Sequence, residues 1–244
     1  LQSTYKLKMI NYIIIYLLLS FVLLFTCGKI SYKLNLVDLP NRRKIHSKSV
    51  AYTGGITISC IYIISILLFD IFDNNLNVIL SFAFLISLIG LIDDKYSLNV
   101  GGKLSLQIFP IFYLIFFENL SLNQIGNYNY FELNLGAFNI PFTLICVLFL
   151  INSFNYFDGM DGTLSFTSIS VLAILFFLIQ DQNFQLFLII ILIPIAIFLC
   201  FNFSLFKLPK IFLGDSGSLL IGFIISFILI YLANQNLVHP LLLA

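Results

Sequence analysis

The sequence predicts an all-α protein: a polytopic bundle of about eight transmembrane helices in a single integral membrane domain, residues 1–244. Of the 244 residues, 60% are hydrophobic and only 9% are charged, whereas soluble domains average roughly 45–50% and 25%. The mean hydropathy of +1.05 leaves no polar half that could fold in water. At about 20 apolar residues per crossing, the chain has room for roughly eight spans. The few dispersed lysines and arginines exclude a nucleic-acid-binding surface.

Eight apolar runs set the positions of the predicted helices. The shortest contains about 14 residues, so the helix ends must include neighbouring polar residues. The alternation of apolar and polar residues that a half-buried strand requires is absent. Pro110 and Pro194 fall inside runs, where we expect kinks that neighbouring helices tolerate. The runs are 10–27, 54–72, 76–92, 104–117, 138–151, 164–179, 186–203 and 219–232.

The amino-terminal residues and the cysteines carry no functional signal. Met9 stands directly before the first apolar run, and we expect it to be the true start, with residues 1–8 upstream of it. The first run leads into a basic loop, as a retained first span does, so we expect no cleaved signal peptide. The four cysteines have no CxxC spacing, and we interpret them as small buried hydrophobic residues. They are Cys27, Cys60, Cys146 and Cys200.

Basic residues gather in alternate loops, which predicts how the chain is oriented. Loops 28–53, 93–103, 152–163 and 204–218 hold ten of the twelve lysines and arginines, and the other two lie within residues 1–8. By the positive-inside rule, these four loops face the cytoplasm. We therefore expect a multi-pass protein of the cytoplasmic (inner) cell membrane.

Six of the eleven acidic residues are aspartates in these same loops, each beside glycine, asparagine or basic residues. Packing of eight spans would bring four separate loops to one surface, so we expect the six carboxylates to converge there. This convergence is the main functional signal in the sequence. The six are Asp38, Asp93, Asp94, Asp158, Asp161 and Asp215.

Asp93 and Asp94 follow the third apolar run and would stand at the carboxyl end of its helix. The helix dipole disfavours negative charge there by about 0.3–1 kcal/mol per carboxylate, so a positive partner is expected. Lys95 is that partner if the pair is only a solvated helix end. Adjacent residues do not share a helix face, so one carboxylate can instead point at a ligand.

The segment 152–162, NSFNYFDGMDG, is harder to explain as a simple turn. Asn152, Asn155, Asp158 and Asp161 recur every three residues and would form one polar stripe on a helical backbone. Carboxylate and amide oxygens suit Mg²⁺, which leaves other coordination positions for water and substrate phosphate. A glycine after each aspartate lets a phosphate approach the backbone. The alternative interpretation is a capped loop between two spans.

The segment 210–218, KIFLGDSGS, immediately precedes the last apolar run. Asp215 is placed either to cap the following helix or to ligate a metal that faces a phosphate.

The basic loop 38–46, DLPNRRKIH, offers guanidinium groups to phosphate oxygens, although the positive-inside rule alone also accounts for it. No Walker or GxGxxG motif occurs. Clustered aspartates and a basic loop favour Mg²⁺-dependent phosphoryl transfer at the membrane.

Four ordered segments resemble the polyprenyl-phosphate N-acetylhexosamine-1-phosphate transferases, the membrane enzymes of the MraY and WecA type. The resemblance covers about residues 10–244, and the PNxRKxH form is closer to the WecA branch, which uses UDP-N-acetylhexosamines. The segments are VDLPNRRKIH with GG at 54–55, GLIDDKYSLNVGGK at 90–103, NSFNYFDGMDG at 152–162 and KIFLGDSGSLLIGF at 210–223.

The resemblance implies a reaction and its participants. A polyprenyl phosphate, expected to be undecaprenyl phosphate, would attack the β-phosphate of a UDP-N-acetylhexosamine and release UMP, with Mg²⁺ or alternatively Mn²⁺ as cofactor. The product would begin a cell-envelope glycan. The alternative within the family is the UDP-MurNAc-pentapeptide phosphotransferase of peptidoglycan synthesis. A homodimer is a further expectation, and no nucleic acid is expected as a partner.

The resemblance also assigns roles by position. Asp93 resembles the family's candidate base, which deprotonates or orients the lipid phosphate, with Asp94 in support. Asp158 and Asp161 match a pair that faces nucleotide and metal. The expected catalytic residues are thus Asp93, Asp94, Asp158 and Asp161; the metal ligands Asp215, Asp158 and Asp94; and the substrate-binding residues Asn152, Asn155, Arg42, Lys44, His46, Lys103 and Lys210.

The chain departs from the family pattern in several places. Ser49 and Ala51 stand where prolines are common, Thr163 replaces a leucine and Leu213 replaces a methionine. The family has ten or eleven spans and a later cytoplasmic loop with a histidine-rich motif, which these 244 residues lack. We therefore expect a carboxyl-terminally incomplete polypeptide with little activity by itself. A secondary transporter is the rival class, but no acidic residue lies in the middle of a run, as a transport site would favour.

Overall fold

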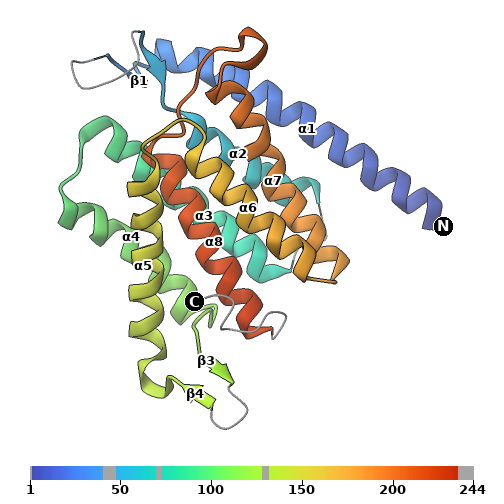
Figure 1. The fold of residues 1–244 in the computed structure, drawn as a ribbon, viewed down its shortest axis with the longest axis vertical. Coiled ribbons are helices and arrows are strands. Elements are labelled where there is room, and N and C mark those ends of the chain that lie inside the picture. Colours follow the sequence, from blue (N-terminus) through green and yellow to red (C-terminus); the bar gives the residue numbers. More distant parts are fainter. Residues whose placement is uncertain (1, 41–47, 70–72, 128–131, 236–244) are drawn as a thin grey trace.

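A computed structural model describes residues 2–40, 48–69, 73–127 and 132–235 (Figure 1). Within these ranges the chain forms eight α-helices, and each predicted apolar run overlaps one of them in order. The helices are α1 (Gln2–Lys33), α2 (Gly54–Leu68), α3 (Asn74–Tyr96), α4 (Val100–Phe116), α5 (Asn139–Phe157), α6 (Thr163–Leu178), α7 (Gln182–Asn202) and α8 (Gly214–Asn234). Pro110 lies inside α4 and Pro194 inside α7, as predicted.

Two small antiparallel sheets accompany the helices, a feature that the all-α prediction missed. Both lie in connections between helices, near opposite ends of the bundle (Figure 1). Backbone groups in these connections need hydrogen-bond partners, and short strand pairs supply them. The strands are β1 (Val37–Asp38) with β2 (Val50–Ala51), and β3 (Gln124–Asn127) with β4 (Glu132–Asn134). Short 3₁₀ turns occur at Gly136–Phe138 and Leu205–Lys207.

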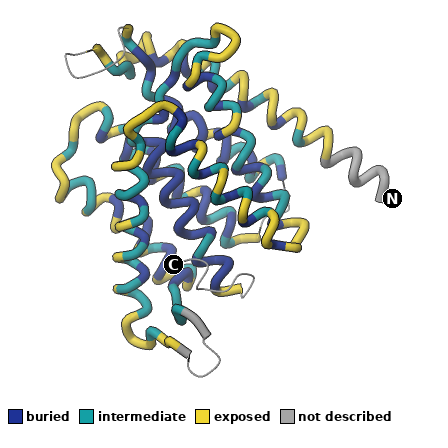
Figure 2. Tube along the Cα trace, in the orientation of Figure 1, coloured by how far each residue is buried: buried dark blue, intermediate teal, exposed yellow. Residues whose placement is uncertain are grey.

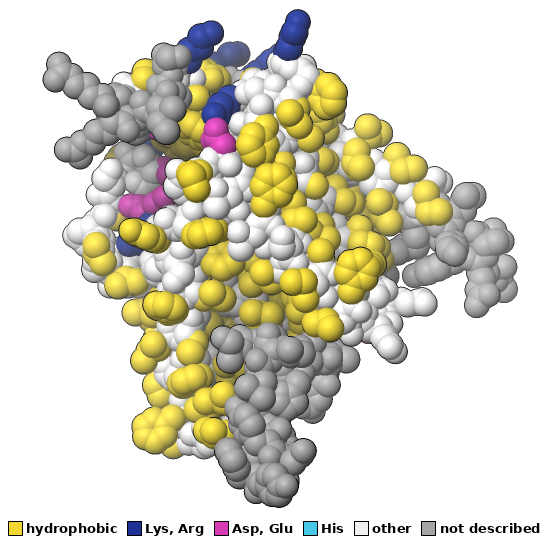
Figure 3. Space-filling view, viewed as in Figure 1, with side chains coloured by type: hydrophobic (Ala, Val, Ile, Leu, Met, Phe, Trp, Pro, Cys, Tyr) yellow, Lys and Arg dark blue, Asp and Glu magenta, His cyan; other side chains and the backbone are white. Residues whose placement is uncertain are grey.

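The bundle belongs to a polytopic membrane protein. Five helical segments among the described residues are long and apolar enough to cross a membrane: Ile10–Lys33, Asn74–Tyr96, Gly136–Phe157, Gln182–Asn202 and Gly214–Asn234. Helices α2, α4 and α6 are apolar but shorter, with 15, 17 and 16 residues. Hydrophobic side chains cover much of the visible flank, whereas the visible charged side chains gather toward one end (Figure 3).

Alternating chain direction brings four separate connections to that charged end, which we call the site end. The carboxyl ends of α1, α3, α5 and α7 lie there, together with the amino ends of α2, α4, α6 and α8 (Figure 1). Every second connection therefore reaches the same surface. This is the arrangement that the distribution of basic residues predicts.

Helix α8 is the central element of the bundle. Figure 2 shows it dark blue over nearly its whole length, and 94% of its most apolar 18-residue window is buried. It packs mainly against α3 and α5, and also against α2. A Cβ at Gly90 of α3 would lie 2.5 Å from the carbonyl carbon and oxygen of Asp215, and a Cβ at Gly55 of α2 would overlap the backbone of Gly217. Only glycine permits this close approach of the backbones.

Backbone hydrogen bonds join the segment before α2 to the segment before α8. The Phe212 amide donates to the Ala51 carbonyl at 2.7 Å, and the Gly54 and Gly55 amides donate to the carbonyls of Phe212 and Leu213 at 3.0 and 2.9 Å. Ala51 also forms a parallel bridge with Ile211. These bonds fix the entry to α8 against the entry to α2.

The cysteines differ from the prediction. All four are free thiols, so no disulfide forms, but none is fully buried: Cys60 is exposed and the other three are half-buried.

Alanine at Gly90 or Gly55 is expected to separate α8 from its neighbours, because the added Cβ meets backbone that cannot rotate away. Each substitution should destabilise the protein by ~1–3 kcal/mol or more, as overpacking does. Thermal unfolding of the detergent-solubilised variants measures the effect.

Gly101→Ala is the matched control, because Gly101 also lies in a helix near the site end and its added Cβ would approach only the Asn99 side chain, at 3.7 Å. It should be neutral or slightly stabilising. Equal melting temperatures for Gly90→Ala and Gly101→Ala would contradict the close-packing argument.

Candidate functional site

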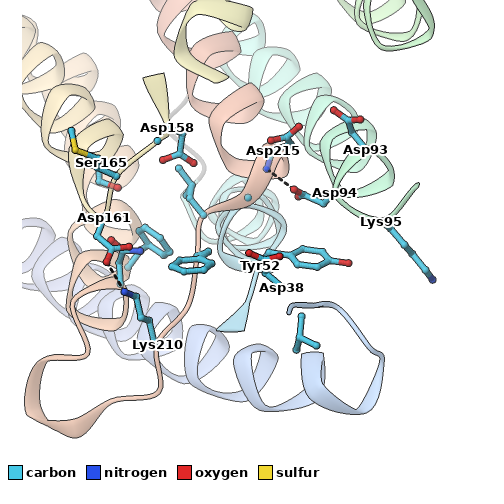
Figure 4. A pocket seen from close by; sticks show the side chains of 18 of the residues that line it. Asp38, Tyr52, Asp93, Asp94, Lys95, Asp158, Asp161, Ser165, Lys210 and Asp215 are labelled. Atoms are coloured by element: carbon cyan, nitrogen blue, oxygen red, sulfur yellow. Dashed lines mark hydrogen bonds and ion pairs between the residues drawn. The ribbon is translucent and has the colours of Figure 1, made fainter. Parts of the chain in front are cut away.

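A cavity of about 1090 Å³ opens at the site end, between the helix ends and the connections (Figure 4). Its lining comes from the ends of α3, α6, α7 and α8 and from the connections that follow α1, α3 and α5 or precede α2 and α8. All six aspartates of the predicted cluster lie along it, so the carboxylates converge as the sequence predicted. They are Asp38, Asp93, Asp94, Asp158, Asp161 and Asp215.

Asp94 caps helix α8 from a different helix. Its Oδ1 accepts the backbone N–H of Asp215 at 3.0 Å, and its Oδ2 accepts that of Ser216 at 3.3 Å. The amino end of α8 therefore offsets a negative charge at the carboxyl end of α3, where the dipole of α3 is unfavourable. Gly214, with φ of +74°, leaves room for this carboxylate, because a Cβ there would lie 2.7 Å from Asp94 Oδ2. The interpretation of Asp215 as the cap is wrong, since Asp215 lies inside the first turn.

Lys103, in the first turn of α4, supplies the positive charge of the cluster. Its ammonium nitrogen lies 2.6 Å from Asp93 Oδ2 and 2.8 Å from Asp215 Oδ2. It also donates to the Asn155 side-chain oxygen at 2.8 Å. All three ammonium donors thus have partners. The Lys103 and Asp93 side chains are only 13% and 9% exposed, so this ion pair is screened little by water.

Lys95 is not the partner of the aspartate pair, contrary to the simplest interpretation of the sequence. Its ammonium lies 5.4 Å from the centre of the Tyr96 ring and points away from the carboxylates (Figure 4). Adjacent helical residues face different directions, so Lys95 projects from a different face of α3 than the carboxylates. The second oxygen of Asp93 instead accepts the Leu98 amide at 2.8 Å.

A polar network continues from Lys103 into the bundle. The Asn155 amide group donates to the Ser218 hydroxyl at 2.8 Å. One helical turn deeper, Asn152 donates to Gln107 at 2.8 Å. The sequence motifs give no indication of Gln107, because it stands alone in an apolar run. Its position four residues after Lys103, on the same face of α4, was the signal that could have identified it.

Asp158 and Asp161 reach the cavity from a loop rather than from a helical stripe. Helix α5 ends at Phe157, so only Asn152 and Asn155 share a helix face. Asp161 pairs with Lys210 at 2.5 Å between Nζ and Oδ2, and the side chains of Lys210 and Asp161 are 33% and 39% exposed. Figure 4 shows this pair across the cavity from Asp93.

Local charge and burial shift two titratable groups in the loops around the cavity. Burial, followed by repulsion from Asp215 and Asp161, raises the pKa of Asp158 to about 7. Burial, followed by the negative charges of Asp94 and Asp38, raises the pKa of Tyr52. Tyr52 therefore keeps its proton at neutral pH and offers a hydroxyl to the cavity, a group that the sequence motifs did not reveal.

The described residues contain no preformed group of three or more His, Cys, Asp or Glu side chains arranged as metal ligands. In this state Lys103 holds Asp93 and Asp215, and the amides of α8 hold Asp94. Arg42, Lys44 and His46 of the predicted basic loop lie outside the described residues. Their predicted contacts with substrate stay predictions.

Comparison with known proteins gives one consistent result. Residues 76–233, which span α3 to α8, match the model of Glycosyl transferase family 4. The chain is 30% identical over 229 residues to the undecaprenyl-phosphate alpha-N-acetylglucosaminyl 1-phosphate transferase of Yersinia pestis. The aligned region covers 92% of this chain and 62% of that protein. The protein of the same name from Escherichia coli strain K12 is 28% identical over the same shares.

A relative from Bacillus subtilis, named "Probable undecaprenyl-phosphate N-acetylglucosaminyl 1-phosphate transferase", is 30% identical over 206 residues. That match covers 81% of this chain and 56% of the relative. The chain thus spans about three-fifths of the length of the curated relatives it matches.

The raised pKa of Asp158 predicts how stability depends on pH when divalent cations are removed. Its pKa in the folded protein lies above the ordinary carboxyl value, so the unfolded state ionises first and is thereby stabilised relative to the folded state. The resulting penalty on folding is absent below about pH 4, grows between about pH 4 and pH 7 and is constant at higher pH. The melting temperature of Asp158→Asn should therefore fall less between about pH 5 and pH 7 than that of the wild-type protein. Parallel melting curves would contradict this assignment.

Proposed function

Because the chain belongs to glycosyl transferase family 4, we propose that it forms part of an enzyme that transfers N-acetylglucosamine 1-phosphate, or a related N-acetylhexosamine 1-phosphate, from a UDP-sugar to undecaprenyl phosphate. Relatives that match 92% of the chain carry the name of this activity. The observation that carries the proposal is the convergence of charged side chains at the site end. Six aspartates and Lys210 line one cavity there, and Lys103 pairs with two of those aspartates.

The proposed reaction exchanges one phosphoanhydride for another. An oxygen of the lipid phosphate forms a bond to the phosphorus that carries the sugar. The bond from that phosphorus to the bridging oxygen breaks, and UMP leaves with the electron pair. Such a transfer depends mainly on positioning and on neutralising charge, which suits a site of fixed charged side chains.

The position of the cavity suits two substrates of opposite solubility. It opens at the ends of apolar helices, so a lipid head group can reach it from the bilayer while a nucleotide enters from water. We propose that all eight helices cross the membrane and that the site end faces the cytoplasm, as the positive-inside rule favours. Its volume of about 1090 Å³ is at the upper end of ordinary ligand sites.

The side chains also fit a divalent cation, by the chemistry of their donor atoms. Oxygens of Asp93, Asp215 and Asn155 already converge on one positive group, the ammonium of Lys103. Mg²⁺, or Mn²⁺ in its place, would neutralise the diphosphate when bound. We propose Asp215 as its principal ligand, with Asp158 nearby, and Asp94 as the residue that positions Asp215 by capping α8.

The remaining residues divide between the two substrates. Asp93 is proposed to orient the lipid phosphate or to accept a proton from it. Both oxygens of Asp93 are engaged, so Lys103 must first release this carboxylate. Asp161 and Lys210 stand at the other side of the cavity and are proposed to face the nucleotide. Asn152 and Asn155 are proposed to place the nucleotide through the network with Gln107 and Ser218.

The test uses the gene product that carries this chain, with undecaprenyl phosphate, Mg²⁺ and a panel of UDP-sugars, and measures UMP release. UDP-N-acetylglucosamine or a related UDP-N-acetylhexosamine should release UMP only in the presence of the lipid. Asp158→Asn and Asp215→Asn should each lower the rate by about 10²–10³-fold, since each removes a charge-stabilising group.

Glu118→Gln removes a carboxylate at the opposite end of the bundle and serves as the control, with a rate within about threefold of the wild-type rate. Release of UMP from UDP-MurNAc-pentapeptide alone would favour the peptidoglycan branch instead. Absence of lipid-dependent UMP release from every UDP-sugar would overturn the proposal.

A further inference from the structure

Lys103 occupies the place in the carboxylate cluster where a positive charge is needed most. Its ammonium contacts oxygens of Asp93, Asp215 and Asn155 at 2.6 to 2.8 Å. We propose that Lys103 is a tethered counter-ion of the carboxylate cluster, and that a divalent cation must displace it from Asp215 when the metal binds. The inference rests on the proposed function and adds an order of binding to it.

The need for a counter-ion follows from the positions of the carboxylates. Asp93 and Asp215 both contact one nitrogen atom, so their own oxygens lie close together although they belong to α3 and α8. Without a cation between them, two carboxylates at this separation repel strongly in a partly dehydrated site. The ammonium therefore keeps the cluster assembled when neither metal nor substrate is present.

The same contact makes the lysine a competitor of the metal. A divalent cation bound at Asp215 would stand within a few ångströms of the ammonium, and the two like charges repel. Lys103 must then leave Asp215, and the diphosphate that accompanies the metal offers it a new anionic partner. Metal alone should consequently bind weakly, whereas metal and nucleotide diphosphate should each strengthen the binding of the other.

The helix that carries Lys103 is held in place on both sides of it. Asn99 caps α4 by accepting the Gly102 amide at 2.7 Å, and Gln107 accepts the Asn152 amide one turn further along. The backbone of α4 is thus anchored, so displacement needs only a change of side-chain rotamer.

The experiment measures Mn²⁺ binding to the gene product that carries this chain by electron paramagnetic resonance, with and without UDP. In the wild-type protein, UDP should tighten Mn²⁺ binding by at least about tenfold. Lys103→Gln should bind Mn²⁺ alone about tenfold more tightly than wild type, because the competing charge is gone. In the same variant, UDP should tighten Mn²⁺ binding much less than it does in the wild-type protein.

Lys95→Gln is the matched control, because Lys95 also lines the cavity but its ammonium lies over a tyrosine ring. Its Mn²⁺ affinity should stay within about twofold of the wild-type value. If Lys103→Gln binds Mn²⁺ no more tightly than wild type, the counter-ion proposal is overturned while the proposed function stands. If the wild-type protein binds no Mn²⁺ even with UDP, or if Asp215→Asn leaves binding unchanged, the proposed metal site itself fails.

A second measurement uses the wild-type protein and tests the displacement of Lys103 even if Lys103→Gln does not fold. Reductive methylation of wild-type protein, read by mass spectrometry, should modify Lys103 faster with saturating Mn²⁺ alone than without Mn²⁺. Removal of Mn²⁺ with a chelator should restore the slow labelling. Equal labelling rates with and without bound Mn²⁺ would overturn the displacement.

Discussion

The structure depends on the close approach of the first turn of α8 to α2 and α3. Glycines at positions 55, 90 and 217 remove the side chains that would hold these backbones apart. The approach lets Asp94 of α3 accept two amides at the amino end of α8 and places Asp215 opposite Asp93. Two helices that are distant in the sequence thereby bring their charged ends together at the site end of the bundle.

The second requirement is charge balance in a place that excludes most water. Carboxylates from several parts of the chain line one cavity, and two kinds of positive group offset them. The first N–H groups of α8 bind Asp94, and lysine ammonium groups pair with the others, Lys103 with Asp93 and Asp215 and Lys210 with Asp161. Because Lys103 acts through a side chain and the helix end is fixed, only the lysine can be exchanged for another cation. The chemistry that we propose for this chain is therefore built on a permanent cap and a replaceable counter-ion.

Much of this arrangement can be predicted from the sequence, and the failures have physical causes. The helices follow from apolar runs, and the convergence of the aspartates follows from alternating loops with basic residues. Local spacing could not reveal that Asp94 caps α8 or that Lys103 pairs with Asp93, because both contacts depend on how α3, α4 and α8 pack. The predicted stripe from Asn152 to Asp161 failed because α5 ends at Phe157. The small sheets are too short to leave a pattern in the sequence.

The most direct measurement is the anomalous scattering of Mn²⁺ in an experimental structure of the gene product with UDP bound. The account predicts one metal peak about 2.1 Å from a carboxylate oxygen of Asp215, a Lys103 ammonium that has left that carboxylate for the diphosphate, and an Asp94 that still caps α8. A metal bound away from Asp215, with Lys103 still joined to it, would contradict the account.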